Sequence, residues 1–450
     1  MIHTERLASG ATLLLEPVDR TDTLCIGFWF LHGSRDESSG QRGYSHLLEH
    51  MLFKGTAKRS ALSIAQEVDR VGGIINAFTE KEITCVYTII PREHLRLAFD
   101  ILTDMTVGSL LDQAELEKEK EVIVNEIRSV DDSPEEKGHD RYLREMWGEH
   151  ALARKITGEV EEVEGAEREL LVSFSRDWLV PGNTVIAVAG NFDAQEARDL
   201  ASAVFPAKAG SSRPPRTAPA WQRKTAFVAD RFNQVQLYAG TCYPIDHQIP
   251  HYYTSLVFST AFGESMSCRL FQKLREELAL CYTVYSFRTF FSDTGMWTIY
   301  ANTTPAQTPK FLSALDKELS RLLAEPLSHA EIEDAKSHLV GSMILSREDM
   351  ETRMKRLVRQ YLMMDRILSF DESVAALRAV TRDAIETYAK KVLRGDAFSL
   401  LAYGTRGVAR FRGFDFSFAD RAGRRGSAQR QVRGTPPRET RGAPRRGERG

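Results

Sequence analysis

The stretch "GYSHLLEHMLFKGT", residues 43–56, places His46, Glu49 and His50 inside an otherwise apolar run. On a helix that advances by 100° per residue, His50 lies about 40° from His46, and Glu49 lies about 60° away on the other side. All three side chains therefore project within an arc of roughly 100°. Two imidazole nitrogens can then reach one metal ion, and Glu49 stands beside them to accept a proton from a metal-bound water.

A third ligand has to come from elsewhere, and the best candidates lie in "LEKEKEVIVNEI", residues 116–127. Glu119 and Glu126 are seven residues apart, about two helical turns, so they share one helix face. We predict Glu126 as the ligand and Glu119 as a carboxylate that orients a histidine or the bound water. The residues predicted to seat this helix against the core are Val122, Ile123 and Ile127. Two histidines and a carboxylate, with one position left for water, suit catalytic zinc.

Each motif taken singly has a simpler explanation. A His pair at i, i+4 is more often a surface feature or a hydrogen-bonded part of a core than a metal site. A Glu-rich helix is more often a solvated face. Together they favour the metal site, because two His and a Glu buried among Leu, Met and Phe without a shared ion would be costly to satisfy.

The order of predicted elements occurs twice along the chain. Each half opens with strands and a helix, continues with a strand pair and two long helices, and closes with a helix and a strand. The closing segments are "ERELLVSFSRDWLVPGNTVIAVAG" and "TRDAIETYAKKVLRGDAFSLLAYG". We therefore predict an α+β fold of two homologous α/β-sandwich halves, each a mostly antiparallel sheet with long helices packed on one face. The H-x-x-E-H motif is absent from the second half.

Composition divides the chain of 450 residues into four parts. The predicted parts are an N-terminal catalytic zinc-binding domain (1–205), a linker rich in Pro, Ala and Ser (206–224), a C-terminal homologous domain without the H-x-x-E-H motif (225–420) and a tail (421–450). The tail holds ten arginines against two glutamates, a net charge of +8, so the other 420 residues carry −10. We expect the tail to be disordered, because it has too little apolar surface to offset chain entropy.

The remaining composition bounds the setting of the protein. No apolar run is long enough to cross a bilayer, and the N-terminus does not resemble a secretory signal. Five scattered cysteines without C-x-x-C spacing argue against a disulfide framework or a thiolate metal site. We expect a soluble protein in a reducing cytoplasm.

The stretch "GSRDESSGQRGYSHLLEHMLFKGT", residues 33–56, resembles the active-site region of the pitrilysin-type inverzincins, whose signature is H-x-x-E-H. The likeness is to the short branch that includes the bacterial and mitochondrial processing peptidases, and it extends over about residues 5–405. The resemblance implies one zinc ion per chain, bound by His46, His50 and Glu126, with Glu49 as the general base. It also implies that the C-terminal domain (225–420) is an inactive homologue of the first and binds substrate. A homodimer, or a pairing with a related chain, is a further implication of the resemblance.

Further site residues follow from the resemblance alone. Asn76 and Ala77, in "VGGIINAFTEKEITCVY", match the family's edge strand, onto which a substrate backbone adds. Arg275 and Tyr282 match an Arg and Tyr pair that anchors substrate, and Tyr282 is a candidate to hydrogen-bond the oxyanion. Without the resemblance, a surface Arg and a core Tyr would be the simpler interpretation.

The sequence thus predicts a zinc-dependent endopeptidase that hydrolyses extended peptides or unfolded segments, in which Glu49 activates a zinc-bound water. The charge of −10 favours substrates with basic residues. One alternative is a non-catalytic subunit that presents substrate, although such subunits typically have broken metal motifs. Another is an RNA- or membrane-associated adaptor that uses the basic tail, which has no aromatic residues for base stacking.

Overall fold

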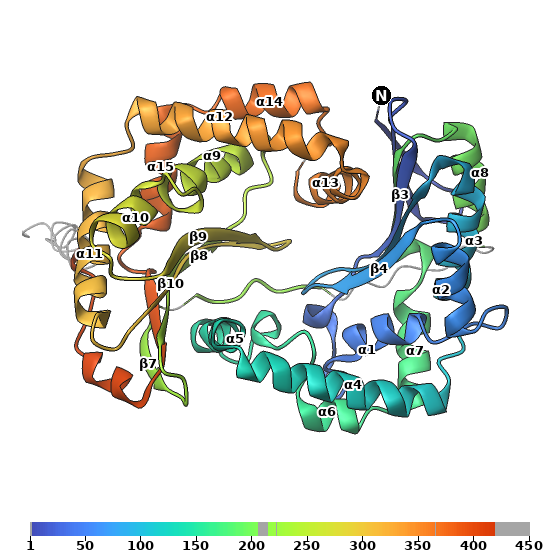
Figure 1. The fold of residues 1–450 in the computed structure, drawn as a ribbon, viewed down its shortest axis with the longest axis horizontal. Helices are drawn as coiled ribbons and strands as arrows, with labels where there is room; N and C mark the ends of the chain where they lie inside the picture. Colours follow the sequence, from blue (N-terminus) through green and yellow to red (C-terminus); the bar gives the residue numbers. More distant parts are fainter. Residues whose placement is uncertain (1, 206–214, 222, 365, 419–450) are drawn as a thin grey trace, which may run out of the picture.

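The computed structural model describes residues 2–205, 215–221, 223–364 and 366–418, and these residues form two sheets with helices around each (Figure 1). The predicted tail at 421–450 and residues 206–214 and 222 of the predicted linker lie outside the described residues. No helix in the described ranges is long and apolar enough to cross a membrane.

The first sheet has the strand order β1-β2-β6-β3-β5-β4, in which β2 and β6 are parallel and the other neighbours are antiparallel. Its strands are β1 (His3–Arg6), β2 (Thr12–Pro17), β3 (Thr23–Phe30), β4 (Ile74–Thr79), β5 (Thr84–Pro91) and β6 (Thr184–Gly190). Residues of β3 alternate between the two faces, as a period of two requires, and both faces are buried. This explains why "TLCIGFWF" is apolar throughout.

The second sheet repeats this arrangement without the β1 equivalent. Its order is β7-β11-β8-β10-β9, and β7 and β11 form the parallel pair. Its strands are β7 (Thr225–Ala229), β8 (Val235–Pro244), β9 (Thr283–Phe290), β10 (Thr294–Thr303) and β11 (Ser399–Gly404). The shared order confirms the predicted fold of two similar α+β halves.

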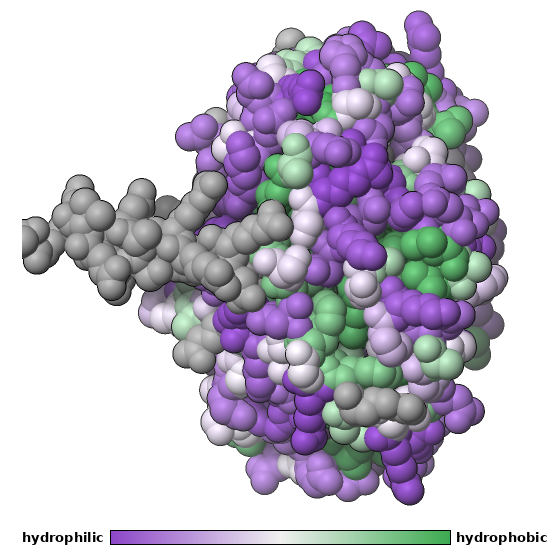
Figure 2. Space-filling model, turned by 90° about the vertical axis from the view of Figure 1, so that its left-hand side faces the viewer, coloured by the Kyte–Doolittle hydropathy of each residue, from purple (hydrophilic) through white to green (hydrophobic). Residues whose placement is uncertain are grey.

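Helices of the same half cover one face of each sheet. Over the first sheet these are α1 (Tyr44–Leu52), α2 (Ala61–Asp69), α3 (Leu95–Val107), α4 (Gln113–Asp132), α7 (Arg168–Trp178) and α8 (Ala194–Ala203). Over the second they are α9 (Ile249–Ser259), α11 (Thr308–Ala324), α12 (His329–Leu345), α14 (Phe370–Arg378) and α15 (Arg382–Val392), with the short α10 (Arg269–Phe271). The outer face of the second half is mostly hydrophilic, with hydrophobic residues in small separate patches (Figure 2).

The other face of each sheet is covered by a helix from the opposite half, which the sequence did not predict (Figure 1). Helix α13 (Met350–Met363) packs on the first sheet, and α5 (Pro134–Trp147) packs on the second. Both contacts are close. A Cβ on Gly27 of β3 would lie 2.7 Å from Met354 Sδ, and one on Gly138 of α5 would lie 3.0 Å from Tyr238 Cε2. This reciprocal packing of α13 and α5 buries the second face of each sheet and forms an interface between the two halves.

One predicted packing residue is wrong. Ile123 and Ile127 are buried in the first core, but Val122 is 47% exposed. The buried face of α4 runs through Leu116, Glu119, Ile123 and Ile127. Val122 is 100° from Ile123 around the helix axis and falls outside that face.

Candidate functional site

Helix α1 carries the first three predicted site residues, and contacts with neighbouring segments of the chain fix the residue at which this helix begins. Gly43 precedes the helix with φ +84°, and a Cβ there would lie 2.6 Å from the carbonyl oxygen of Thr157. The buried carboxyl of Glu37 accepts hydrogen bonds from the backbone N–H of Gly43 and of Ser45, both at 2.8 Å. Burial raises the pKa of Glu37 to about 8, and the two backbone donors oppose that rise. The first turn of α1 is therefore held by both sterics and hydrogen bonds.

The structure brings His46, His50 and Glu126 together as the sequence predicts. His46 Nε2 lies 3.7 Å from Glu126 Oε1, and His50 Nε2 lies 3.7 Å from Glu126 Oε2. One ligand atom from each residue lies within 4.8 Å of the other two. Glu126 comes from α4, which packs beside α1.

These residues fit a zinc ion. Ligand atoms at the usual zinc distances around a tetrahedron are about 3.4 Å apart, close to the two separations here. Burial and the nearby His50 lower the pKa of His46 to about 4, so its imidazole is neutral and its lone pair is free at neutral pH. Two imidazole nitrogens and one carboxylate are a donor set that catalytic zinc commonly takes.

Glu119 lies on the far side of His50 from Glu126. His50 Nδ1 is 3.0 Å from Glu119 Oε2, and Lys54 Nζ is 2.6 Å from Glu119 Oε1. A proton on Nδ1 directed at this buried carboxylate leaves Nε2 unprotonated and facing Glu126. This geometry suits the orienting role predicted for Glu119.

The side chain of Glu49 extends from α1 to Thr79 at the end of β4. Thr79 Oγ1 donates a hydrogen bond of 2.5 Å to Glu49 Oε2. Burial raises the pKa of Glu49, whereas the Thr79 hydroxyl and His50 lower it. Sequence reasoning missed Thr79. Its only signal was its place as the last residue of the strand that carries Asn76 and Ala77.

Strand β4 lies at the edge of the first sheet and packs against α1. Asn76 is exposed and Ala77 is partly buried. The N–H of Ala77 is bonded to the Asn76 side-chain oxygen at 2.8 Å. An edge strand of this kind can accept another extended chain.

Arg275 and Tyr282 lie together in the second half. The Arg275 guanidinium is 5.1 Å from the Tyr282 ring centre, and Tyr282 is 76% exposed. Both line a cavity of about 250 Å³ with Phe271 and Met266, and no residue of α1 or α4 contributes to it. The structure therefore pairs these two residues, in a cavity that His46, His50 and Glu126 do not line.

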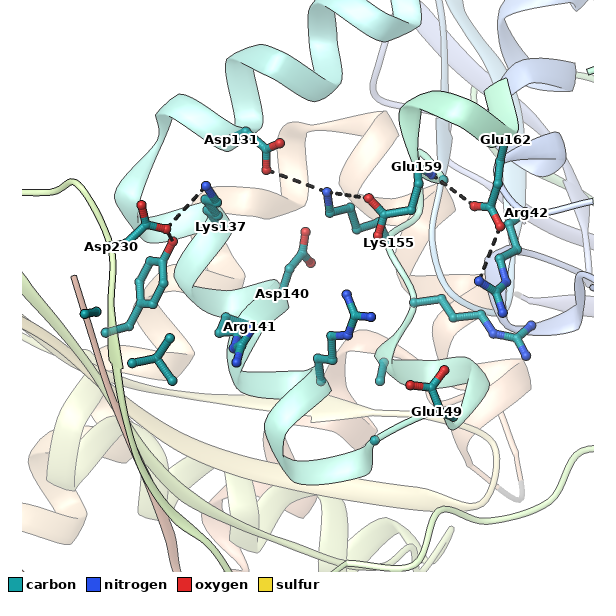
Figure 3. Close-up of a pocket in the computed structure, with 18 residues that line it drawn as sticks. Arg42, Asp131, Lys137, Asp140, Arg141, Glu149, Lys155, Glu159, Glu162 and Asp230 are labelled. Carbon is teal, nitrogen blue, oxygen red and sulfur yellow. Dashed lines mark hydrogen bonds and ion pairs between the residues drawn. The ribbon is translucent and has the colours of Figure 1, made fainter. Parts of the chain in front are cut away.

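A larger cavity, of about 340 Å³, lies between α5, the end of α4 and the end of β7 (Figure 3). Six basic and six acidic residues line it, and many pair with one another. Lys155 contacts Asp131 and Glu159, and Lys137 contacts Asp230. None of the predicted site residues lines this cavity, so it is distinct from the candidate metal site.

Two protein-family models match this chain. Residues 13–160 match the model of the family described as "Insulinase (Peptidase family M16)", and residues 166–339 match "Peptidase M16 inactive domain". The second match begins at residue 166, within the first half, and its range contains no H-x-x-E-H motif.

Individual relatives and structures point the same way. An uncharacterized zinc protease of Bacillus subtilis, YmxG, is 32% identical over 88% of this chain and 97% of its own length. Another from Streptomyces coelicolor is 34% identical over 87% of each protein. A peptidase M16 inactive domain from Pseudomonas fluorescens has the same fold, with a TM-score of 0.83 at 19% identity over 90% of this chain and 98% of that one. A protease from Helicobacter pylori aligns with a TM-score of 0.81 at 18% identity, over 90% and 99% of the two chains. These matches confirm the resemblance seen in the sequence, and the chain belongs to peptidase family M16, the insulinase family.

Proposed function

We propose that this protein is a zinc-dependent endopeptidase that hydrolyses extended peptides or unfolded segments. The observation that carries the proposal is the convergence of His46, His50 and Glu126 from two helices, with their ligand atoms within 4.8 Å of one another. Glu49 lies on the same helix as the two histidines. The zinc-protease names of the relatives also support it.

In this proposal His46, His50 and Glu126 hold one zinc ion, which would lower the pKa of a water molecule and polarise the scissile carbonyl. Glu49 takes a proton from the water and returns it to the leaving nitrogen. Its hydrogen bond from Thr79 leaves one carboxylate oxygen for this transfer. Glu119 keeps the proton of His50 on Nδ1.

Substrate binding in this proposal uses the backbone. A peptide adds to the free edge of β4 around Asn76 and Ala77, which requires an extended chain and makes little demand on sequence. Folded proteins are then poor substrates. Arg275 and Tyr282 hold another part of the substrate from the second half, and the negative charge of the body favours basic peptides.

The deciding experiment compares wild type with Glu49→Gln on a library of unstructured peptides, together with metal analysis of both proteins. We expect one zinc per chain in both, cleavage by wild type that a chelator stops, and a loss of kcat by orders of magnitude in the variant. His50→Ala and Glu126→Ala should lose zinc. Zinc-loaded wild type that cleaves no peptide would instead favour a subunit that presents substrate, and Glu49→Gln with wild-type turnover would refute the mechanism.

A further inference from the structure

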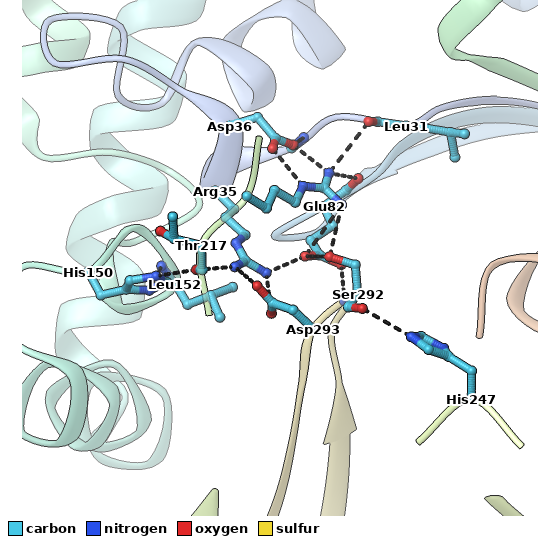
Figure 4. Close-up of polar contacts among 12 residues, drawn as sticks. Leu31, Arg35, Asp36, Glu82, His150, Leu152, Thr217, His247, Ser292 and Asp293 are labelled. Atoms are coloured by element: carbon cyan, nitrogen blue, oxygen red, sulfur yellow. Dashed lines mark hydrogen bonds and ion pairs between the residues drawn. The ribbon is translucent and has the colours of Figure 1, made fainter. Parts of the chain in front are cut away.

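A group of charged and polar residues, of which Arg35 and Glu82 are buried, joins the two halves close to the end of β4 (Figure 4). We call it the Arg35 cluster. Its members are Arg35, Glu82, Arg216, Ser292 and Asp293. Arg35 belongs to the 3₁₀ turn η1 (Ser34–Asp36), and Glu82 belongs to the turn between β4 and β5. Ser292 and Asp293 form the tip of the β9–β10 hairpin, which comes from the second half.

Arg35 uses both terminal nitrogens to connect these elements. Its Nη1 donates to Glu82 at 2.5 Å and to Asp293 Oδ1 at 2.9 Å. Its Nη2 donates to Asp293 Oδ2 at 2.5 Å and to the carbonyl oxygen of Thr217 at 2.7 Å. The Arg35 side chain is 2% exposed, so these contacts are the means by which a buried guanidinium is neutralised.

Glu82 also makes several contacts, with the hairpin tip of the second half and with Arg216. It accepts hydrogen bonds from the N–H and the hydroxyl of Ser292, both at 2.8 Å. Arg216 approaches its carboxylate at 3.4 Å and also forms a two-pronged contact with Asp36, at 2.7 and 2.8 Å. The hairpin tip of the second half therefore contacts the turn after β4 through a carboxylate that is 9% exposed.

The same cluster holds the backbone of that turn. The N–H of Arg35 donates to the carbonyl oxygen of Lys81 at 2.8 Å, and that of Ser34 donates to Glu80 at 3.3 Å. Within the turn, the N–H of Glu80 donates to the carbonyl oxygen of Ile83 at 2.7 Å. The residue just before the turn is Thr79, whose hydroxyl bonds Glu49.

From this chain of contacts we propose that the Arg35 cluster is a positioning device for Glu49. Docking of Asp293 and Ser292 fixes Arg35 and Glu82, these fix the β4–β5 turn, and the turn sets where the Thr79 hydroxyl meets Glu49. The second half thereby contributes to proton transfer without touching the reacting atoms. The inference rests on the proposed role of Glu49 as general base.

The test is a double-mutant cycle between Asp293 and Thr79, measured as kcat and KM on an extended fluorogenic peptide. Thr79→Val should lower kcat about tenfold, as expected for one lost hydrogen bond to a charged group, while Thr79→Ser should stay within about twofold of wild type. Asp293→Ala should lower kcat about fivefold with little change in KM. Asp293→Asn keeps the shape of the side chain and serves if the alanine variant folds poorly. Combined with Thr79→Val, Asp293→Ala should lower kcat no further.

A matched control breaks a different buried ion pair between the halves. Glu16 on β2 contacts Arg353 and Arg356 of α13, both at 2.7 Å. The same helix reaches the β4–β5 turn through a different residue, Arg359, which pairs with Glu80 at 2.6 Å and is left intact in this control. Glu16→Gln should leave kcat within about twofold of wild type. A loss equal to that of Asp293→Ala would mean that any weakening of the docked halves lowers activity, and would overturn the positioning role. Independent, multiplying effects of Asp293→Ala and Thr79→Val would overturn it as well.

A second measurement does not depend on activity. Hydrogen exchange at the amides of residues 79–83 should be faster in Asp293→Ala than in wild type or Glu16→Gln, with zinc content unchanged. A wild-type protein without peptidase activity would refute the proposed function, and the exchange data would still decide whether the cluster holds the turn. Unchanged exchange in Asp293→Ala would refute the coupling.

Discussion

Replacing Glu119 by glutamine should weaken zinc binding without unfolding the protein. Gln keeps the size of the side chain and removes the charge that lies 3.0 Å from His50 Nδ1 and 2.6 Å from Lys54 Nζ. A charge-assisted hydrogen bond of this kind contributes about 1.5–3 kcal/mol. Since about 1.4 kcal/mol equals a tenfold change, the zinc Kd should rise about 10- to 100-fold.

The assay is competition for zinc against a chromophoric chelator, with Glu121→Gln as the control. Glu121 lies on the same helix and is exposed, so its variant should bind zinc like wild type. In Glu119→Gln the Lys54 ammonium is left beside a ligand histidine without its carboxylate partner. Adding Lys54→Met should therefore recover part of the lost affinity. Equal zinc affinity of Glu119→Gln and wild type would refute the orienting role of Glu119.

Two further predictions concern the edge strand and the core. Ala77→Pro removes an N–H that bonds to the side-chain oxygen of Asn76, and proline is tolerated in edge strands, so the sheet should tolerate the change. The KM for extended peptides should rise about tenfold because strand addition is blocked, and an unchanged KM would exclude β4 as the docking edge. Burial lowers the pKa of His32 to about 3, so between that pH and about pH 6.5 the unfolded state binds a proton that the folded state does not. The free energy of unfolding therefore decreases as the pH is lowered, by about 2 kcal/mol at pH 5. The His32→Phe variant keeps a ring that can stack on Trp178 but has no group that titrates. In denaturant titrations this variant should lose less stability than wild type between pH 7 and pH 5. Equal losses would show that His32 is not the source of the pH dependence.

Much of the site was predictable because its determinants are local. The arc shared by His46, Glu49 and His50 follows from helix geometry, and so does the shared face of Glu119 and Glu126. The structure adds the convergence of the two helices, which the sequence could only suggest through the cost of burying unshared polar groups. Val122 was misplaced because three adjacent apolar positions do not define which face of a helix meets the core.

The contacts between the halves were not predictable. The pattern of α13 shows an apolar stripe, but nothing local says that the stripe covers the sheet of the other half. Arg35, Glu82 and Asp293 are far apart in the chain, and each read singly is an ordinary surface charge. Thr79 likewise gained a role only when the end of β4 was placed beside α1.

By itself the sequence determined the periodic features of this protein: the repeated order of strands and helices and the spacing of the candidate ligands. These depend on the repeat of the backbone, which acts over a few residues. The tertiary structure alone decided which helix covers which sheet, and which distant charges neutralise each other near Glu49. The reason is that a buried apolar face or charge needs a partner, and the sequence contains several surfaces that could serve as that partner. Only the folded chain shows which of these surfaces is used.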